Sequence, residues 1–221
     1  MPEQPVADSF PGRALPLAAL RPSAAGVLND RSSALALLRT RRSAKPRSLG
    51  EPGPDEDHLR AIIEIAGRTP DHGKLTPWRF IRIRKEQRDA FAALLESAYR
   101  ADNPEPGRLE IEAVHRFARQ APMLVVAVFS PVESSKIPVW EQQLSCGAAC
   151  MNLLHAAHAL GFSAGLVTGW AAYSEAVLRG LGGSEQERIA GFIFIGTPTE
   201  EPEERIRPAP EEILSDWAPG A

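Results

Sequence analysis

The sequence has few cysteines and no long hydrophobic run, and both shortages exclude classes of protein. Its only two cysteines, Cys146 and Cys150, are four positions apart in an apolar stretch. That spacing places both on one helix face and matches neither a zinc ribbon nor a CxxC redox site. No apolar run approaches the ~20 residues that a membrane helix requires. We therefore expect two buried thiols, no metal site and no membrane partner.

An excess of positive charge is also missing. The formal net charge is -3, so the chain has no overall positive field with which to release counterions from nucleic acid. Residues 1–30 contain proline, alanine and arginine but also acidic residues, and they lack the apolar core of a secretory signal. These observations predict a cytoplasmic protein that binds no nucleic acid. We interpret residues 1–30 as a partly disordered extension, or as an arm that orders only against a partner.

The remaining length, residues 31–221, suits one domain with a single hydrophobic core. Strand patterns occupy 78–83, 123–129 and 189–196, and 165–169 is a short strand or turn between glycines. Helical patterns occupy 33–41, 58–67, 86–99, 109–119, 141–160 and 174–181, with Asp57 as the expected N-cap of the second. Residues 48–57 are predicted to be a loop, and the acidic tail has Trp217 as its only aromatic anchor. Interleaved strands and helices predict a mixed architecture but identify no ligand.

The longest predicted helix, 141–160, is apolar nearly all round. A helix of this kind is normally buried on every side. We therefore expect it in the middle of the fold or at an interface between subunits. Gly161 is suited to end it, because glycine readily adopts the conformation that follows a helix C-terminus.

Arg41, Arg42 and Ser43 lie at the end of the first predicted helix. Guanidinium groups bind phosphate through paired charge-assisted hydrogen bonds, and a hydroxyl adds another donor. An arginine pair at a helix C-terminus can equally be a solvated face that the helix dipole favours. The triplet is a candidate phosphate site that needs support from other motifs.

A second polar cluster occupies the break after the helix 58–67. Residues 68–74 read Arg-Thr-Pro-Asp-His-Gly-Lys, and Pro77-Trp78 follows. Such a loop can wrap a polar ligand with a guanidinium, an imidazole and an ammonium. The alternative is a plain helix-to-strand connection in which Asp71 and His72 satisfy local backbone groups.

Glycine-bounded segments form a third candidate surface. Residues 165–169, Gly-Leu-Val-Thr-Gly, and the later Gly196-Thr197-Pro198 can let backbone amides approach a flat ring, although glycines at strand ends are commonly turn residues. The sequence contains no GxGxxG, P-loop, HExxH or GxSxG pattern. It therefore gives no support to the usual dinucleotide-binding, kinase, protease or hydrolase interpretations.

Taken in order, these segments resemble the nitroreductase family over about residues 33–200. The resemblance is carried by Arg41-Arg42-Ser43, by the Pro-Asp-His and Pro-Trp-Arg-Phe segments within 68–80, by 136–142 (Lys-Ile-Pro-Val-Trp-Glu-Gln) and by 191–198 (Gly-Phe-Ile-Phe-Ile-Gly-Thr-Pro). It implies an α+β fold with a central mixed or antiparallel sheet flanked by helices, in an intertwined homodimer. It also implies two FMN sites at the dimer interface, each built by both subunits.

The resemblance assigns roles to particular residues. Arg41, Arg42 and Ser43 hold the phosphate and ribityl side of FMN, while Arg68 and His72 reach the flavin from their loop. The segment whose backbone lies along the isoalloxazine ring is matched by Leu166, Val167, Thr168 and Gly169. Many relatives carry a further cation after the Gly-Thr-Pro strand, for which the only candidates are Arg205 and Arg207, and we select Arg207.

The function implied is that of an oxidoreductase with electrons from NAD(P)H. It would reduce small electrophiles such as nitroaromatics or quinones by a ping-pong hydride mechanism, with the chemistry on the flavin and no catalytic side chain. One alternative is a specialised flavoenzyme of the same fold, such as a dehalogenase, an enzyme of flavin or cobamide ring metabolism, or an azoline oxidase-like protein. Another is a non-enzymatic flavin-binding module.

Overall fold

The computed structural model describes residues 27–134 and 136–219, so the interpretation of residues 1–26 lies outside the described part. Its strands are β1 (Leu49–Gly50), β2 (Trp78–Ile83), β3 (Met123–Phe129), β4 (Ser163–Val167) and β5 (Arg188–Pro198). Strand β3 lies between β2 and β5, while β4 and β1 both pair with β5. All of these pairings are antiparallel. The expected sheet is therefore present in its antiparallel form.

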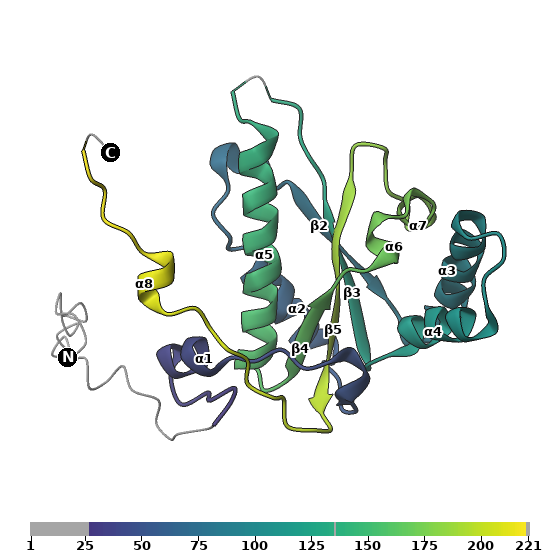
Figure 1. The fold of residues 1–221 in the computed structure, drawn as a ribbon, viewed down its shortest axis with the longest axis horizontal. Coiled ribbons are helices and arrows are strands. Elements are labelled where there is room, and N and C mark those ends of the chain that lie inside the picture. The colour runs from purple at the N-terminus through teal and green to yellow at the C-terminus, as the bar shows by residue number, and fades with distance from the viewer. Residues whose placement is uncertain (1–26, 135, 220–221) are drawn as a thin grey trace, which may run out of the picture.

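Helices cover both faces of the sheet (Figure 1). Residues of β3 alternate between the faces, so Val125 and Ala127 pack against α2 and α5, while Leu124 and Val126 pack against α3 and α4. This double covering explains why β3 is a continuous apolar run. The helices are α1 (Ala34–Thr40), α2 (Glu56–Ala66), α3 (Arg88–Asp102), α4 (Arg108–Arg119), α5 (Val139–Ala159), α6 (Trp170–Tyr173), α7 (Glu175–Gly180) and α8 (Pro210–Ile213).

Most predicted elements are present, with three local corrections. Asp57 is not the N-cap of α2, because Asp55 accepts the hydrogen bond from the His58 N–H (2.8 Å) and Asp57 lies in the first turn. The expected loop 48–57 contains the short strand β1. The single helix expected over 174–181 is preceded by a separate helix, α6, and the two meet at Ser174.

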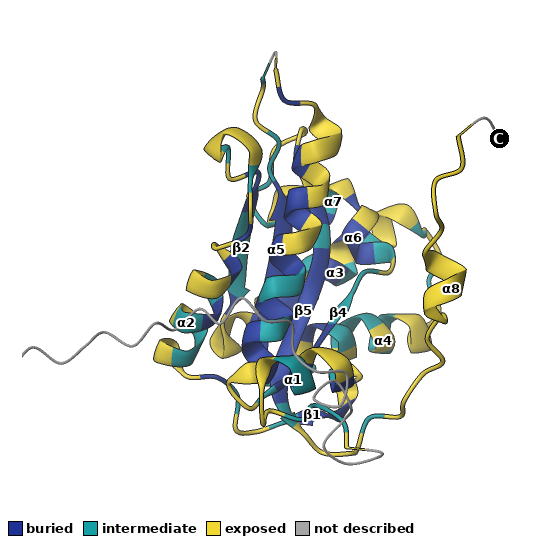
Figure 2. Cartoon of the chain, turned by 90° about the vertical axis from the view of Figure 1, so that its left-hand side faces the viewer, coloured by how far each residue is buried: buried dark blue, intermediate teal, exposed yellow. Residues whose placement is uncertain are grey.

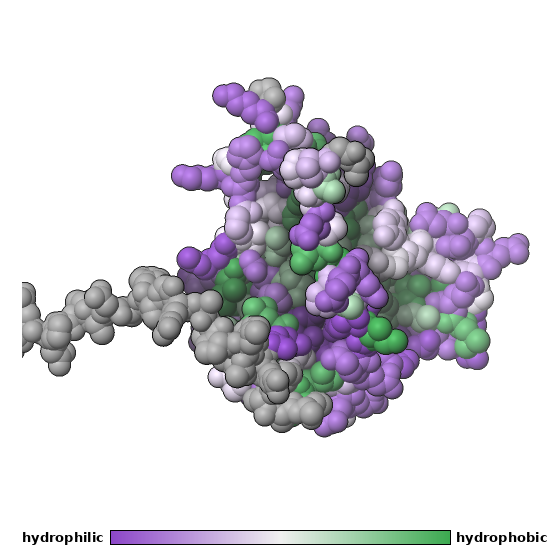
Figure 3. Space-filling model, turned by 60° about the vertical axis from the view of Figure 1, so that its left-hand side comes forward, coloured by the Kyte–Doolittle hydropathy of each residue, from purple (hydrophilic) through white to green (hydrophobic). Residues whose placement is uncertain are grey.

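Helix α5 is buried on one face only. Cys146, Cys150 and Leu153 pack toward the sheet, and both thiols are buried as expected. On the outer face the side chains of Trp140 and Leu144 are 66% and 55% exposed. Figure 2 shows exposed residues along the upper turns of α5, and Figure 3 shows apolar patches on the same side of the molecule. Burial on every side is therefore wrong for the single chain, which leaves the interface between subunits as the remaining expectation.

The C-terminal tail leaves the sheet after β5 and extends away from the body (Figure 1). Trp217 is 85% exposed, so the expectation that it anchors the tail is wrong within one chain. Ile206, Ile213 and Leu214 are exposed as well. No helix in the described part of the chain is long and apolar enough to cross a membrane.

Candidate functional site

The segment of residues 41–43 is held in place from several sides. The side chain of Ser33 caps the N-terminus of helix α1, and the chain leaves helical geometry at Arg41. The Arg42 N–H donates to Asn29 Oδ1 (2.8 Å), and Arg42 Nε donates to the carbonyl of Glu203 (2.6 Å). Residues from before α1 and from the C-terminal tail thus fix the position of the segment.

Arg41 is half-buried, and the described part of the chain offers it no acidic partner. Its Nη1 donates to Ser43 Oγ (3.1 Å), and no carboxylate among the described residues forms an ion pair with it. Burial lowers the pKa of Arg41, and the positive charges of Arg207 and Arg42 lower it further. A desolvated guanidinium surrounded by other cations favours a bound anion, and a phosphate group suits the donors present.

Two histidines of α5, His155 and His158, belong to the same cluster, and neither was among the candidates predicted from the sequence. Burial lowers the pKa of His155, and Arg41 contributes in the same direction. His158 is 1% exposed, and its Nε2 lies 3.2 Å from the carbonyl oxygen of Arg42. Their i,i+3 spacing near the end of a long apolar helix is the signal that could have drawn attention to them.

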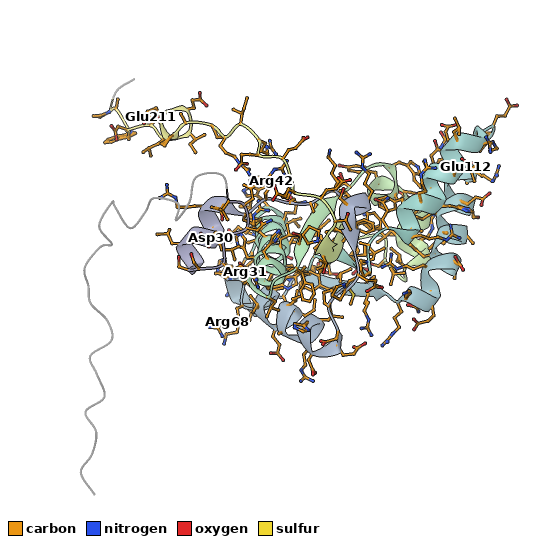
Figure 4. The ribbon with its side chains drawn as sticks, turned by 90° about the horizontal axis from the view of Figure 1, so that it is seen from below. Asp30, Arg31, Arg42, Arg68, Glu112 and Glu211 are labelled. Atoms are coloured by element: carbon orange, nitrogen blue, oxygen red, sulfur yellow. The ribbon has the colours of Figure 1, made fainter. Side chains whose placement is uncertain are left out.

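Arg207 of the tail acts electrostatically on this cluster. Its Nη2 is 3.4 Å from Glu204 Oε1, and its charge acts on Arg41. Figure 4 shows Arg42 at the point where the tail passes the body. Arg41, Arg42, Ser43 and Arg207 therefore share one region of the chain.

Strand β4 lies directly beside this region. A Cβ on Gly165 would be 2.4 Å from the carbonyl oxygen of Ala44, so only glycine allows this approach. Leu166 and Val167 follow in β4, and Gly169 has a positive φ of 71°. Thr168 and Gly169 line a cavity of about 280 Å³ together with Tyr99 and Trp170. The segment 166–169 thus begins next to the arginine cluster and ends at a cavity.

His72 is at the opposite end of α5 from the arginine cluster. Its Nδ1 lies 2.7 Å from Glu141 Oε2 in the first turn of that helix, whereas His158 contacts Arg42 near the last turn. His158 follows Glu141 by 17 positions, which span about 25 Å of helix. Arg68 points outward on a different side of the molecule from Arg42 (Figure 4). One chain therefore does not bring the two predicted halves together.

The loop that contains Arg68 and His72 is fixed by hydrogen bonds from α5 and by one within the loop. Ser145 Oγ donates to the carbonyl of Pro70 (2.7 Å), and Asn152 donates to Thr69 Oγ1 (2.7 Å). Asp71 accepts a hydrogen bond from the Thr76 N–H (2.6 Å). This is the local role expected of Asp71 if the loop is only a connection between a helix and a strand. The contacts hold the loop against α5 while the His72 side chain stays 64% exposed. No group of three or more potential metal ligands occurs in the described part of the chain.

Known proteins match both the sequence and the fold. The model of the family described as the Nitroreductase family matches residues 38–197. The Escherichia coli (strain K12) protein named "Putative NAD(P)H nitroreductase YdjA" is 36% identical over 165 residues, covering 75% of this chain and 88% of its own. A nitroreductase-like family protein from Bacillus cereus has a TM-score of 0.69 at 20% identity, covering 84% of this chain and 96% of its own. The FMN- and NADPH-dependent nitroreductase NfnB from Sphigopyxis sp. strain HMH has a TM-score of 0.66 at 18% identity, covering 84% and 99%.

Proposed function

Because the chain belongs to the nitroreductase family, we propose that it binds FMN and uses NAD(P)H to reduce a small electrophile. The observation that carries the proposal is Arg41, a half-buried guanidinium with no carboxylate partner among the described residues. Relatives named for NAD(P)H and a fold neighbour named for FMN and NADPH supply the cofactor classes.

The residues present fit the phosphate end of FMN. Arg41 and Arg42 offer guanidinium donors, Ser43 offers a hydroxyl, and Arg207 adds a positive charge from the tail. We assign these four residues to the phosphate and ribityl side. Their charges also stabilise the negative charge that a reduced flavin carries.

We place the isoalloxazine ring along residues Leu166, Val167, Thr168 and Gly169. This segment follows the close approach of Gly165 to Ala44, so it continues directly from the phosphate cluster. The positive φ of Gly169 turns the chain there, and the absence of a side chain leaves the backbone accessible to a flat ring. FMN, when bound, supplies the ring that accepts and donates hydride, so no catalytic side chain is required.

The exposed face of α5 supports a homodimer. Trp140 and Leu144 are large apolar residues in water, and a Cβ added to the neighbouring Gly147 would meet no other part of the chain within 4 Å. Exposed apolar patches of this kind mark protein interfaces, and small residues let two helices approach closely. We therefore propose that α5 packs against α5 of a second copy around a two-fold axis.

Such a dimer joins the two halves of the site. If the two α5 helices run antiparallel and cross near Ala148, residue 141 of one lies opposite residue 155 of the other, because both are seven positions from 148. Glu141 contacts His72, and His155 belongs to the Arg41 cluster. Arg68 and His72 of the partner subunit then complete the FMN site begun by Arg41.

The electron acceptor is proposed as a nitroaromatic or quinone, reduced after NAD(P)H has left the same exposed ring face. A specialised enzyme of the same fold would keep the FMN site and reduce a different acceptor. A flavin-binding module without turnover would keep the FMN site and reduce no acceptor. The cytoplasmic location stays a prediction from the sequence.

The purified protein tests this function directly. We expect a yellow protein that releases FMN on denaturation and oxidises NADH or NADPH when a quinone or nitroaromatic is added. A colourless protein that binds no added FMN would contradict the proposal. Bound FMN without oxidation of either nicotinamide would favour the binding module. Oxidation of NAD(P)H that reduces the bound FMN but passes no electrons to these acceptors would favour a specialised enzyme.

A further inference from the structure

His158 occupies an unusual position for a histidine. Its side chain is 1% exposed near the end of α5, and it is not among the residues proposed to contact FMN. Nδ1 lies 2.7 Å from the carbonyl oxygen of Leu154, and Nε2 lies 3.2 Å from the carbonyl oxygen of Arg42. Both ring nitrogens therefore face hydrogen-bond acceptors.

A neutral imidazole cannot satisfy both contacts. It carries one N–H, so one of its nitrogens presents a lone pair to a carbonyl oxygen, whereas an imidazolium donates from both nitrogens. The shorter distance assigns the single proton to Nδ1 and leaves Nε2 facing Arg42 without one. Burial lowers the pKa of His158, the hydrogen bonds to the carbonyl oxygens of Leu154 and Arg42 raise it, and the charges of Arg41 and His155 lower it.

We propose that His158 is a positioning residue that takes up a proton when a phosphate monoester binds at residues 41–43. The proposal rests on the FMN site proposed above. A phosphate dianion beside Arg41 offsets the positive charge of Arg41, which adds to burial in opposing protonation of the imidazole. The protonated ring then donates to the Arg42 carbonyl and fastens the phosphate-binding segment to α5. By linkage, proton binding strengthens phosphate binding to the same extent.

Other charged groups also surround His158. The imidazole borders a cavity of about 860 Å³, whose lining includes both acidic and basic side chains. The arginines and carboxylates are present with and without the ligand, so the bound anion is the charge that is added, and His155 is the second imidazole on which that charge acts. The charged groups concerned are Arg31 and Asp30 before α1, Arg39, Arg41 and Arg42 at α1, His155 on α5, and Glu200, Glu201, Glu204 and Arg207 in the tail.

Isothermal titration in two buffers of different ionisation heat measures the proton uptake. Between pH 7 and 8.5 a phosphate monoester, with its second pKa near 6, is mainly a dianion and contributes little itself. We expect wild-type protein to take up a substantial fraction of one proton with FMN and none with riboflavin, which lacks the phosphate. The Kd for FMN should rise with pH, approaching tenfold per pH unit where uptake is complete.

Two variants assign the proton. His158→Gln keeps an amide donor but cannot titrate, so it should lose the uptake and the pH dependence of the Kd. His155→Gln, which removes the other histidine near Arg41, should retain both. Equal uptake in wild type and His158→Gln, or loss in His155→Gln alone, would overturn the proposal.

A measurement on the unaltered protein covers the case in which His158→Gln does not fold. The imidazole of His158, observed by NMR, should titrate at a higher pH with FMN bound than in the free protein, and an unchanged titration would overturn the inference. FMN binding without proton uptake would refute only the role of His158. Failure of FMN to bind at all would refute the proposed function, and this inference with it.

Discussion

Arg41 differs from the buried Arg88 in where its hydrogen bonds go. Burial lowers the pKa of Arg88 to about 10. Its donors reach the carbonyl oxygens of Ile83 (3.1 Å), Ala118 (2.8 Å) and Gln120 (3.1 Å), so it joins three segments of the fold. The Arg41 side chain donates to Ser43 and keeps further donors for a ligand. Arg88 therefore stabilises the fold, and Arg41 is the candidate for binding.

Replacing Arg41 by alanine should weaken FMN binding by ~1.5–3 kcal/mol, the usual magnitude for hydrogen bonds to a charged group. Quenching of flavin fluorescence on titration measures the affinity. Arg108→Ala is the control, because Arg108 is an exposed arginine on α4, in the layer on the other side of the sheet. The assignment of the phosphate site is wrong if the two variants bind FMN equally well.

Glu187 forms the best-satisfied ion pair of the described chain, away from the FMN site. Its carboxylate accepts from Arg79 Nε (2.7 Å) and Nη2 (3.0 Å), from the Ser184 N–H (2.9 Å) and from Ser130 Oγ. The hydrogen bonds from Arg79 are the main cause that lowers the pKa of Glu187 to about 2. The pair ties β2 to the start of β5 across the sheet.

This lowered pKa predicts how stability depends on pH. Protons bind more readily to Glu187 in the unfolded chain, so its contribution is fully present above the ordinary pKa of ~4.3 and is lost as pH falls toward about 2. Glu187→Gln should destabilise the protein at pH 7 by ~1.5–3 kcal/mol, and by less at pH 3. Urea unfolding at both pH values measures this, with the exposed Glu185→Gln as control. A loss that is the same at pH 3 and pH 7 would contradict the role of the ionised carboxylate.

At the level of elements, sequence patterns predicted what depends on local periodicity. The strand β3 has the predicted bounds, 123–129, because its apolar run is continuous. The two-residue strand β1 was missed because it exists only through pairing with the distant end of β5. The N-cap of α2 was placed two residues late because Asp55 and Asp57 offer the same side chain, and only the backbone geometry distinguishes them.

The site shows the same division between local and distant information. The Arg41-Arg42-Ser43 triplet could be predicted because its residues are contiguous. The helical spacing of His155 and His158 could have marked them as a pair, but the contact of His158 with Arg42 could not be predicted, because it joins positions 116 residues apart. The resemblance suggested a site shared by two subunits, and the fold supplies the physical reason, since α5 separates His72 from Arg41 within one chain.

Helix α5 provides the test of the interface. Leu144→Glu places a charge in the apolar face proposed to contact the second copy, so it should shift the protein toward monomers and lower FMN occupancy. Sedimentation at micromolar concentration measures the shift. Leu109→Glu is the control, because Leu109 is also an exposed leucine but lies on α4, in the layer on the other side of the sheet. A Leu144→Glu protein that sediments as the wild type does would exclude this face from the interface.

At the scale of the whole molecule, a single chain is incomplete in two respects. The residues proposed to bind FMN lie in two groups at opposite ends of α5, and the tail leaves Ile206, Ile213, Leu214 and Trp217 exposed. A second copy of the chain would complete each proposed site, because it supplies the other group of residues. It would also offer a surface on which the apolar tail residues can be buried. Our central claim is therefore that each FMN site takes Arg41 from one subunit and His72 from the other.

Mixed dimers test this claim most directly. One subunit would carry Arg41→Ala, the other would carry Arg68→Ala with His72→Ala, and two different affinity tags would isolate the mixed species. Each parent dimer should bind FMN weakly at both sites. The mixed dimer should recover one site of wild-type affinity, because the intact Arg41 of one subunit then faces the intact Arg68 and His72 of the other. A mixed dimer that binds FMN no better than its parents would contradict a site shared between subunits.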